Sequence, residues 1–150
     1  AMRAYAVGNR NPGTLLVRAE RLLEIVPGGM FYHGDRVPRS QLNRAFLAIN
    51  RVLEANPRNA FACRLYTLAW LRTDSIPSER QIRKILDSCR MLPANSELHF
   101  LASELLFSLR RFKEAESLLE DLARNLHKPD ERGRALDRLE RLRERIHGAG

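Results

Sequence analysis

The chain has 150 residues, of which 44% are hydrophobic and 29% are charged. This composition is typical of one soluble globular domain and excludes a disordered chain, because enough apolar side chains are present to form a core. Apolar runs stay short of the roughly 20 residues that a transmembrane helix needs, and the N-terminus has no secretory-signal pattern. We therefore expect a soluble protein without direct membrane insertion, and the cytoplasm is the favoured location.

The formal net charge is +8, and the basic excess lies mostly in the first half of the chain. A basic face attracts acidic partners or the phosphates of nucleic acid. Genomic base composition explains an enrichment in arginine equally well. The candidates for a basic face are Arg36, Arg39, Arg44, Arg51, Arg58, Arg64 and Arg72.

Glycine is absent from residues 35–132, although the chain contains eight glycines. Hairpin-rich β structure normally needs glycine in its turns, so this long stretch favours helices. Prolines punctuate the stretch, and proline begins helices well but interrupts them badly. The sequence therefore predicts an all-α fold.

Caps and apolar periodicity predict about seven helices in chain order. The first begins at Asn11 and Pro12 and ends at the Pro27-Gly28-Gly29 stop, and the segment MFYHGDRV that follows is predicted as a loop. The other helices are predicted at about 39–55, at about 58–72, from 78 onward, at about 95–109, at about 112–126 and beyond Pro129.

Two joints between predicted helices, NPRNAF and LPANSELHF, share one pattern. In each, a proline (Pro57 or Pro93) ends the outgoing helix, and the asparagine two residues later caps the incoming one. Pro129 follows Pro93 at the same interval of 36 residues, and such a period indicates a repeat protein. A capping box formed by Ser78 and Gln81 is predicted for the helix that begins at 78.

Measured against a unit near 34 residues, the third proline, Pro129, marks the start of a cap, and the equal spacing of 36 carries less meaning than the joints themselves. Pairs of antiparallel helices at a period near 34 resemble the tetratricopeptide repeat (TPR) family. The best match is LRRFKEAESLLEDL at 109–122, in which Phe112 corresponds to the turn aromatic, Ala115 to the small residue of the second helix and Leu119 to the large apolar residue. Other matching positions are His99, Ala102, Ser103 and Leu106 in one first helix, and Cys63, Tyr66, Thr67 and Trp70 in the one before it. The leading aromatic and both usual glycines of the family are missing, and the resemblance covers about 39–129.

The resemblance implies antiparallel helix pairs stacked as a short right-handed TPR-like α-solenoid in a single domain of residues 1–150. Its expected parts are an N-terminal helix and irregular loop (1–38), a repeat core (39–129) and a C-terminal capping helix (130–150). A non-repeat helical bundle is the alternative. Cys63 and Cys89 are expected to be small structural core residues, because neither lies in a metal or redox motif.

In TPR proteins, the first helices of the pairs line a concave groove that accepts a peptide or a partner helix. The resemblance thus implies a non-catalytic protein-interaction scaffold with an apolar groove floor and charged edges. The groove residues that it implies are Phe61, Arg64, Leu68, Leu71 and Arg72 from one pair, and Glu97, Phe100, Glu104, Phe107 and Ser108 from the next. The alternative is that Leu68, Phe100 and Phe107 are packed beneath a terminal helix.

The sequence contains no residue pattern that indicates a catalytic site. The four histidines, His33, His99, His127 and His147, are scattered, and no phosphate loop or nucleophile motif occurs. We expect no enzymatic activity, no cofactor and no metal site, and a packing or surface role for His99. The expected partner is a protein or peptide of unknown identity, and oligomerisation is left open. The alternatives are a nucleic-acid-binding helical repeat and a soluble accessory domain of a larger membrane protein or enzyme.

Overall fold

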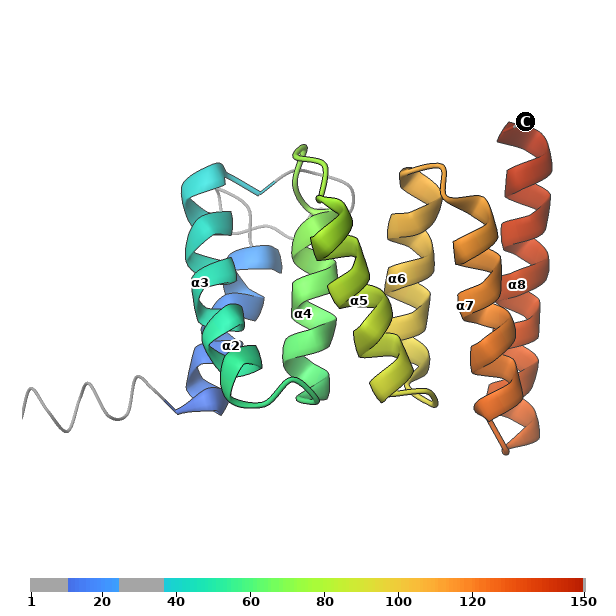
Figure 1. Ribbon diagram of the computed structural model, residues 1–150, viewed down its shortest axis with the longest axis horizontal. Helices are drawn as coiled ribbons and strands as arrows, with labels where there is room; N and C mark the ends of the chain where they lie inside the picture. The colour runs from blue at the N-terminus through green and yellow to red at the C-terminus, as the bar shows by residue number, and fades with distance from the viewer. Residues whose placement is uncertain (1–10, 25–36, 150) are drawn as a thin grey trace, which may run out of the picture. The chain divides into compact units, whose positions relative to one another are not determined.

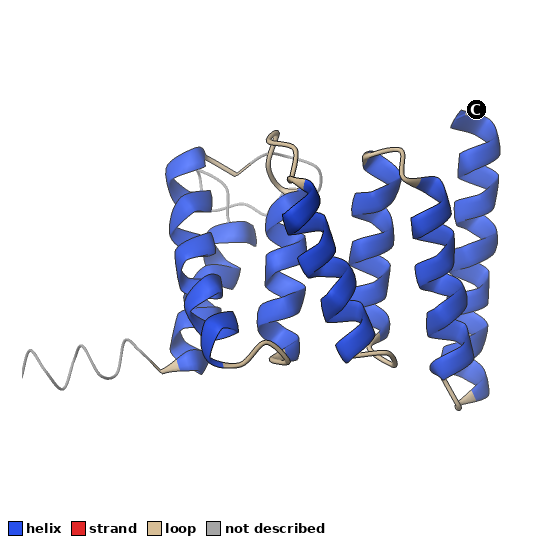
Figure 2. Cartoon of the chain, in the orientation of Figure 1, coloured by secondary structure: helices blue, strands red, loops and turns tan. Residues whose placement is uncertain are grey.

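The computed structural model describes residues 11–24 and 37–149, and within these ranges the chain forms helices and loops but no strands (Figure 2). The helices are α2 (Pro12–Glu24), α3 (Arg39–Ala55), α4 (Ala60–Leu71), α5 (Glu79–Met91), α6 (Ser96–Ser108), α7 (Phe112–Asn125) and α8 (Pro129–Ala149) (Figure 1). The predicted all-α fold with seven helices is confirmed for the described part. The Pro27-Gly28-Gly29 stop and most of the loop predicted after it lie outside the described residues.

The helices belong to two compact units. Unit 1 comprises residues 1–76 and holds α2, α3 and α4, while unit 2 comprises residues 77–150 and holds α5 to α8. The boundary lies within the repeat core that the sequence predicts at 39–129. The stacking of all pairs into one right-handed solenoid therefore stays a prediction, and so does the likeness to the TPR family.

Side-chain hydrogen bonds cap the first turns of three helices at the positions that the sequence predicts. The side-chain oxygens of Asn59 and Asn95 each accept a hydrogen bond of 3.0 Å from the backbone N–H three residues later. At the start of α5, Ser78 and Gln81 form the predicted capping box with both reciprocal bonds. Each cap satisfies an amide that the first helical turn leaves without a partner, so these side chains fix where α4, α5 and α6 begin.

In unit 1, α3 has one flank toward α2 and the other toward α4. The side-chain nitrogen of Gln41 donates to the carbonyl oxygen of Leu22 at 2.6 Å, which places the start of α3 beside the end of α2. On the opposite flank, the ring of Phe46 lies 5.8 Å from that of Tyr66 and 5.0 Å from that of Trp70, both on α4. The core between the three helices includes the fully buried side chains Leu16, Leu23, Ile49 and Leu65.

In unit 2, α7 packs against both α6 and α8. Four small residues on these helices, at most 3% exposed, are Ala102, Ser103, Ala115 and Ala135. Small side chains at a contact allow helix backbones to approach closely. Larger buried residues, including Leu98, Leu119 and Leu122, fill the rest of the core. Cys89 of unit 2, like Cys63 of unit 1, is buried and forms no disulfide, which agrees with the predicted structural role.

The turn between α6 and α7 contains a residue in the left-handed region of the backbone. Arg110 has a φ of 60°, a conformation that costs an L-residue roughly 1–2 kcal/mol and that glycine adopts freely. The Arg110 guanidinium lies 5.5 Å from the ring centroid of Phe112, and such a contact contributes about 0.5–1 kcal/mol at an exposed site. The cation–π contact therefore offsets part of the backbone strain that the missing glycine leaves.

Candidate functional site

The predicted groove residues of unit 2 lie on one stripe of α6. Phe100, Glu104 and Phe107 recur every three or four residues, the spacing at which side chains share a helix face. All three are half-buried, whereas the residues between them are mostly buried. The full stripe, which we call the α6 stripe, is Glu97, Phe100, Glu104, Phe107 and Ser108.

Two arginines of α8 lie over the two aromatic rings of the α6 stripe. The guanidinium carbon of Arg138 lies 4.4 Å from the ring centroid of Phe100, and that of Arg145 lies 4.1 Å from the centroid of Phe107. Arg145 also donates to Glu104 at 2.7 Å. The C-terminal helix thus contacts the stripe, as one alternative for Phe100 and Phe107 foresaw, yet both rings stay half-exposed.

The predicted groove residues of unit 1 are partly engaged by α2. Arg64 donates to Glu20 of α2 at 2.6 Å, and its guanidinium carbon lies 5.1 Å from the ring centroid of Phe61. The other predicted residues are half-buried or buried: Leu68, Leu71 and Arg72. The ten predicted groove residues therefore fall into two sets of five, one in each unit.

Four of the six described members of the predicted basic face are exposed. Arg64 is paired with Glu20, and Arg72 is only 9% exposed. Arg36 lies outside the described residues. The exposed members are Arg39, Arg44, Arg51 and Arg58.

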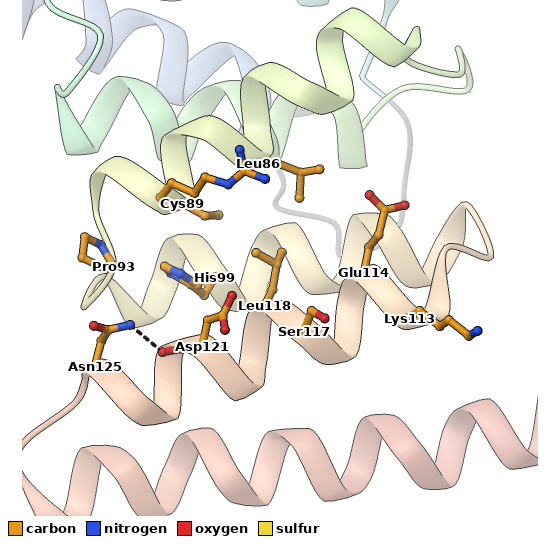
Figure 3. Close-up of a pocket in the computed structure, with 11 residues that line it drawn as sticks. Leu86, Cys89, Pro93, His99, Lys113, Glu114, Ser117, Leu118, Asp121 and Asn125 are labelled. Atoms are coloured by element: carbon orange, nitrogen blue, oxygen red, sulfur yellow. Dashed lines mark hydrogen bonds between the residues drawn. The ribbon is translucent and has the colours of Figure 1, made fainter.

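A cleft of about 420 Å³ opens between α5, α6 and α7 of unit 2 (Figure 3). Leu86 and Cys89 of α5 line one wall, and Leu118 and Asp121 of α7 line the other. His99 of α6 lies at its base and is 2% exposed. The cleft has the size of a small-ligand pocket.

The surroundings of His99 favour its neutral form. Its Nδ1 lies 2.7 Å from the carbonyl oxygen of Asn95, so the Nδ1–H donates this hydrogen bond and Nε2 is left as an acceptor. Burial lowers the pKa of His99 below its ordinary value, and the hydrogen bond to Asn95 opposes this effect. Of the two roles expected for this histidine, packing or surface, the burial of His99 fits packing.

We expect acid to destabilise the protein through His99. Because the pKa of His99 is lowered in the folded state, the unfolded chain binds more protons once the pH falls below about 6.5. The free energy of unfolding should therefore be highest above that pH and fall as the pH drops further. Urea denaturation at neutral and acidic pH measures the loss. The control is His99→Asn, which keeps a donor near Asn95 but does not titrate, and an equal loss in both chains would contradict the assignment.

The residues of the same chain that contact the candidate site residues were not predicted from the sequence. Glu20, Arg138 and Arg145 contact the predicted residues from other helices, and none was among the candidates. One signal was available in the sequence: Phe100 and Phe107 are seven residues apart, as are Arg138 and Arg145. Equal spacing on two helices allows two parallel contacts, because seven residues make about two turns.

Comparison with protein-family models, with curated proteins and with solved structures finds no match to this chain. Among the described residues, no group of three or more histidine, cysteine or carboxylate side chains is placed to hold a metal ion. Within the same residues, no helix has the length and apolar character that crossing a membrane requires.

Proposed function

We propose that the protein is a non-catalytic, TPR-like interaction module that binds a peptide or a partner helix along the α6 stripe. The observation that carries this proposal is the pair of half-exposed rings, Phe100 and Phe107, held in place by Arg138 and Arg145. Aromatic and arginine side chains are the residue types that most often anchor protein interfaces. The α6 stripe supplies the aromatic rings, and α8 supplies the arginines that lie over them.

The cation–π contacts favour binding because they order the site in advance. A ring fixed under a guanidinium group loses less side-chain freedom when a partner covers it. Covering apolar surface favours association, and the affinity that results depends on how well the anchor residues are ordered in advance and not on the buried area alone. The charge of Arg145 is balanced by Glu104, so the exposed carboxylate of Glu97 at the start of the stripe is the charge that can orient a bound segment.

The likeness of α6 and α7 to a TPR pair adds support from the fold. Ala102, Ser103 and Ala115 match small positions of the family pattern, and all three are buried in unit 2. The family places its binding surface on first helices, and α6 occupies that place in the matched pair. None of the residues that the resemblance implies for binding on α6 is fully buried: Glu97 and Ser108 are exposed, and Phe100, Glu104 and Phe107 are half-buried.

Peptides selected from a random library against the whole protein test the proposal. We expect Phe100→Ala to weaken the selected peptides by about tenfold or more, since it removes an anchor of the stripe. Phe100→Leu, which keeps most of the apolar volume, should weaken them less. Amide chemical shifts of the bound protein should change along α6 and α8.

The matched control is Leu92→Ala, which truncates a half-buried residue at the C-cap of α5 that is not a member of the stripe. Circular dichroism and amide exchange confirm that both variants remain folded. Equal loss of peptide binding in Phe100→Ala and Leu92→Ala would refute the assignment to the stripe. So would peptides whose chemical-shift changes avoid α6 altogether.

A further inference from the structure

We infer that a second surface, the outer seam between α2 and α3, binds an acidic protein segment that carries an apolar side chain. The seam is defined by Leu15 and Arg18 of α2 and by Arg44, Leu47 and Arg51 of α3. It lies in unit 1 and shares no residue with the α6 stripe, so the inference does not depend on the function proposed for that stripe.

Contacts between the two helices bring these residues together. The end of α2 lies beside the start of α3 through the hydrogen bond from Gln41 to Leu22. The start of α2 lies beside the end of α3, because Leu15 and Arg51 line the same hollow. The helices therefore run antiparallel, and Arg18 lies at a level between those of Arg44 and Arg51, which are about 10 Å apart along α3.

The seam has an apolar hollow beside its charges. The hollow has a volume of about 290 Å³ and opens to solvent, and its lining residues are Pro12, Leu15, Arg51, Val52 and Ala55. Four of these five are apolar, so the hollow favours an apolar side chain with a negative group next to it. Leu47, which is 61% exposed, extends the apolar surface along α3.

The charge of the seam is largely uncompensated. Arg18, Arg44 and Arg51 are exposed, and none forms an ion pair with a described residue. The carboxylate of Glu20 is bound to Arg64, and Glu54, one turn after Arg51, makes no ion pair with it in the described part of the chain. Unit 1 as a whole contains eleven arginines but only five carboxylate side chains.

An acidic protein segment fits this surface better than nucleic acid does. Single-stranded nucleic acid is held by arginines together with aromatic side chains on which bases stack. The seam offers no aromatic ring, because Phe46 of α3 is turned toward Tyr66 and Trp70 on the opposite flank. A peptide can instead place a leucine in the hollow and carboxylates on the guanidinium groups, which bind carboxylates through paired hydrogen bonds.

Fluorescence anisotropy with a short labelled peptide of glutamate and leucine residues tests the inference on the full chain. We expect this peptide to bind about tenfold or more tightly than the same peptide with glutamine in place of glutamate. The double variant Arg44→Gln/Arg51→Gln should lose most of that difference. Leu47→Ser should also weaken the peptide, because it removes exposed apolar surface without changing the charge.

The chain offers a closely matched control on α5. Arg83 and Arg90 are also exposed and seven residues apart, so Arg83→Gln/Arg90→Gln removes the same charge at the same spacing from unit 2. Arg90 differs from the arginines of the seam in that it pairs with Asp87 at 3.3 Å. The inference requires this control to bind the acidic peptide as the unmodified protein does. Equal losses in both double variants would overturn it, since only the net charge would then matter.

Two other occupants would give different results in the same assay. Tighter binding of a mixed single-stranded RNA than of the peptide, with a steep loss at rising salt and no effect of Leu47→Ser, would overturn the inference in favour of nucleic acid. Binding of phosphatidylserine vesicles without binding of the peptide would overturn it in favour of a lipid surface. Because the α6 stripe is intact in every variant of the seam, failure here is distinguishable from failure of the proposed function.

Discussion

Leu119→Ala is expected to lower the free energy of unfolding of unit 2 by about 2–5 kcal/mol. Leu119 is 1% exposed on α7, the helix that packs against both α6 and α8. Truncation to alanine loses the burial of the side chain and leaves a cavity that its neighbours fill only in part. The loss is a large fraction of the stability of a small domain.

Amide hydrogen exchange along α6, α7 and α8 is the appropriate measurement. The single tryptophan, Trp70, lies on α4, so its fluorescence monitors unit 1 instead. The control is Leu136→Ala, the same substitution at a position of α8 that is 49% exposed, and its effect should stay within about 0.5 kcal/mol. Comparable losses of protection in both variants would contradict the buried position of Leu119.

Ala115→Leu is expected to destabilise unit 2 by about 1–3 kcal/mol through overpacking. Ala115 is 0% exposed in the second helix of the best-matched pair. A leucine there would force α7 away from its neighbours or force side chains out of their preferred rotamers. Exchange protection should therefore fall in α6 and α7, and urea denaturation gives the size of the effect.

Ser117→Leu is the control for Ala115→Leu, since it adds a leucine to an exposed position on the same helix. It should change the stability little. If Ala115→Leu proved as stable as Ser117→Leu, the small residue would not be required for close packing, and the TPR-like reading of α6 and α7 would lose its main physical support.

The helices could be predicted from the sequence because their ends are fixed by local chemistry. Asn59, Asn95 and Ser78 each bond to an amide three residues away, and such bonds follow from the order of residues alone. Pro57 and Pro93 separate the helices in the same local way. Predicted and observed helix boundaries therefore agree closely wherever the chain is described.

The candidate sites could be predicted only in part, because each depends on how helices are rotated against one another. The stripe of Phe100 and Phe107 follows from helical spacing, yet the sequence does not say that Arg138 and Arg145 lie over these rings. Arg64 was a candidate for partner binding, and its bond to Glu20 joins residues 44 positions apart. The periodicity of the sequence shows which residues share one face of a helix, but it does not show which other helix packs against that face.

The two arginine–aromatic contacts also restrict the axial register between α6 and α8. A slide of α8 by seven residues, about 10 Å, would bring one arginine over the wrong ring and leave the other ring without a cation. A slide of four residues would instead bring Arg134 and Arg141 to the two rings, because these arginines are also seven residues apart. The contacts therefore allow α8 few positions along α6, and the short connection that leads into α8 selects among them.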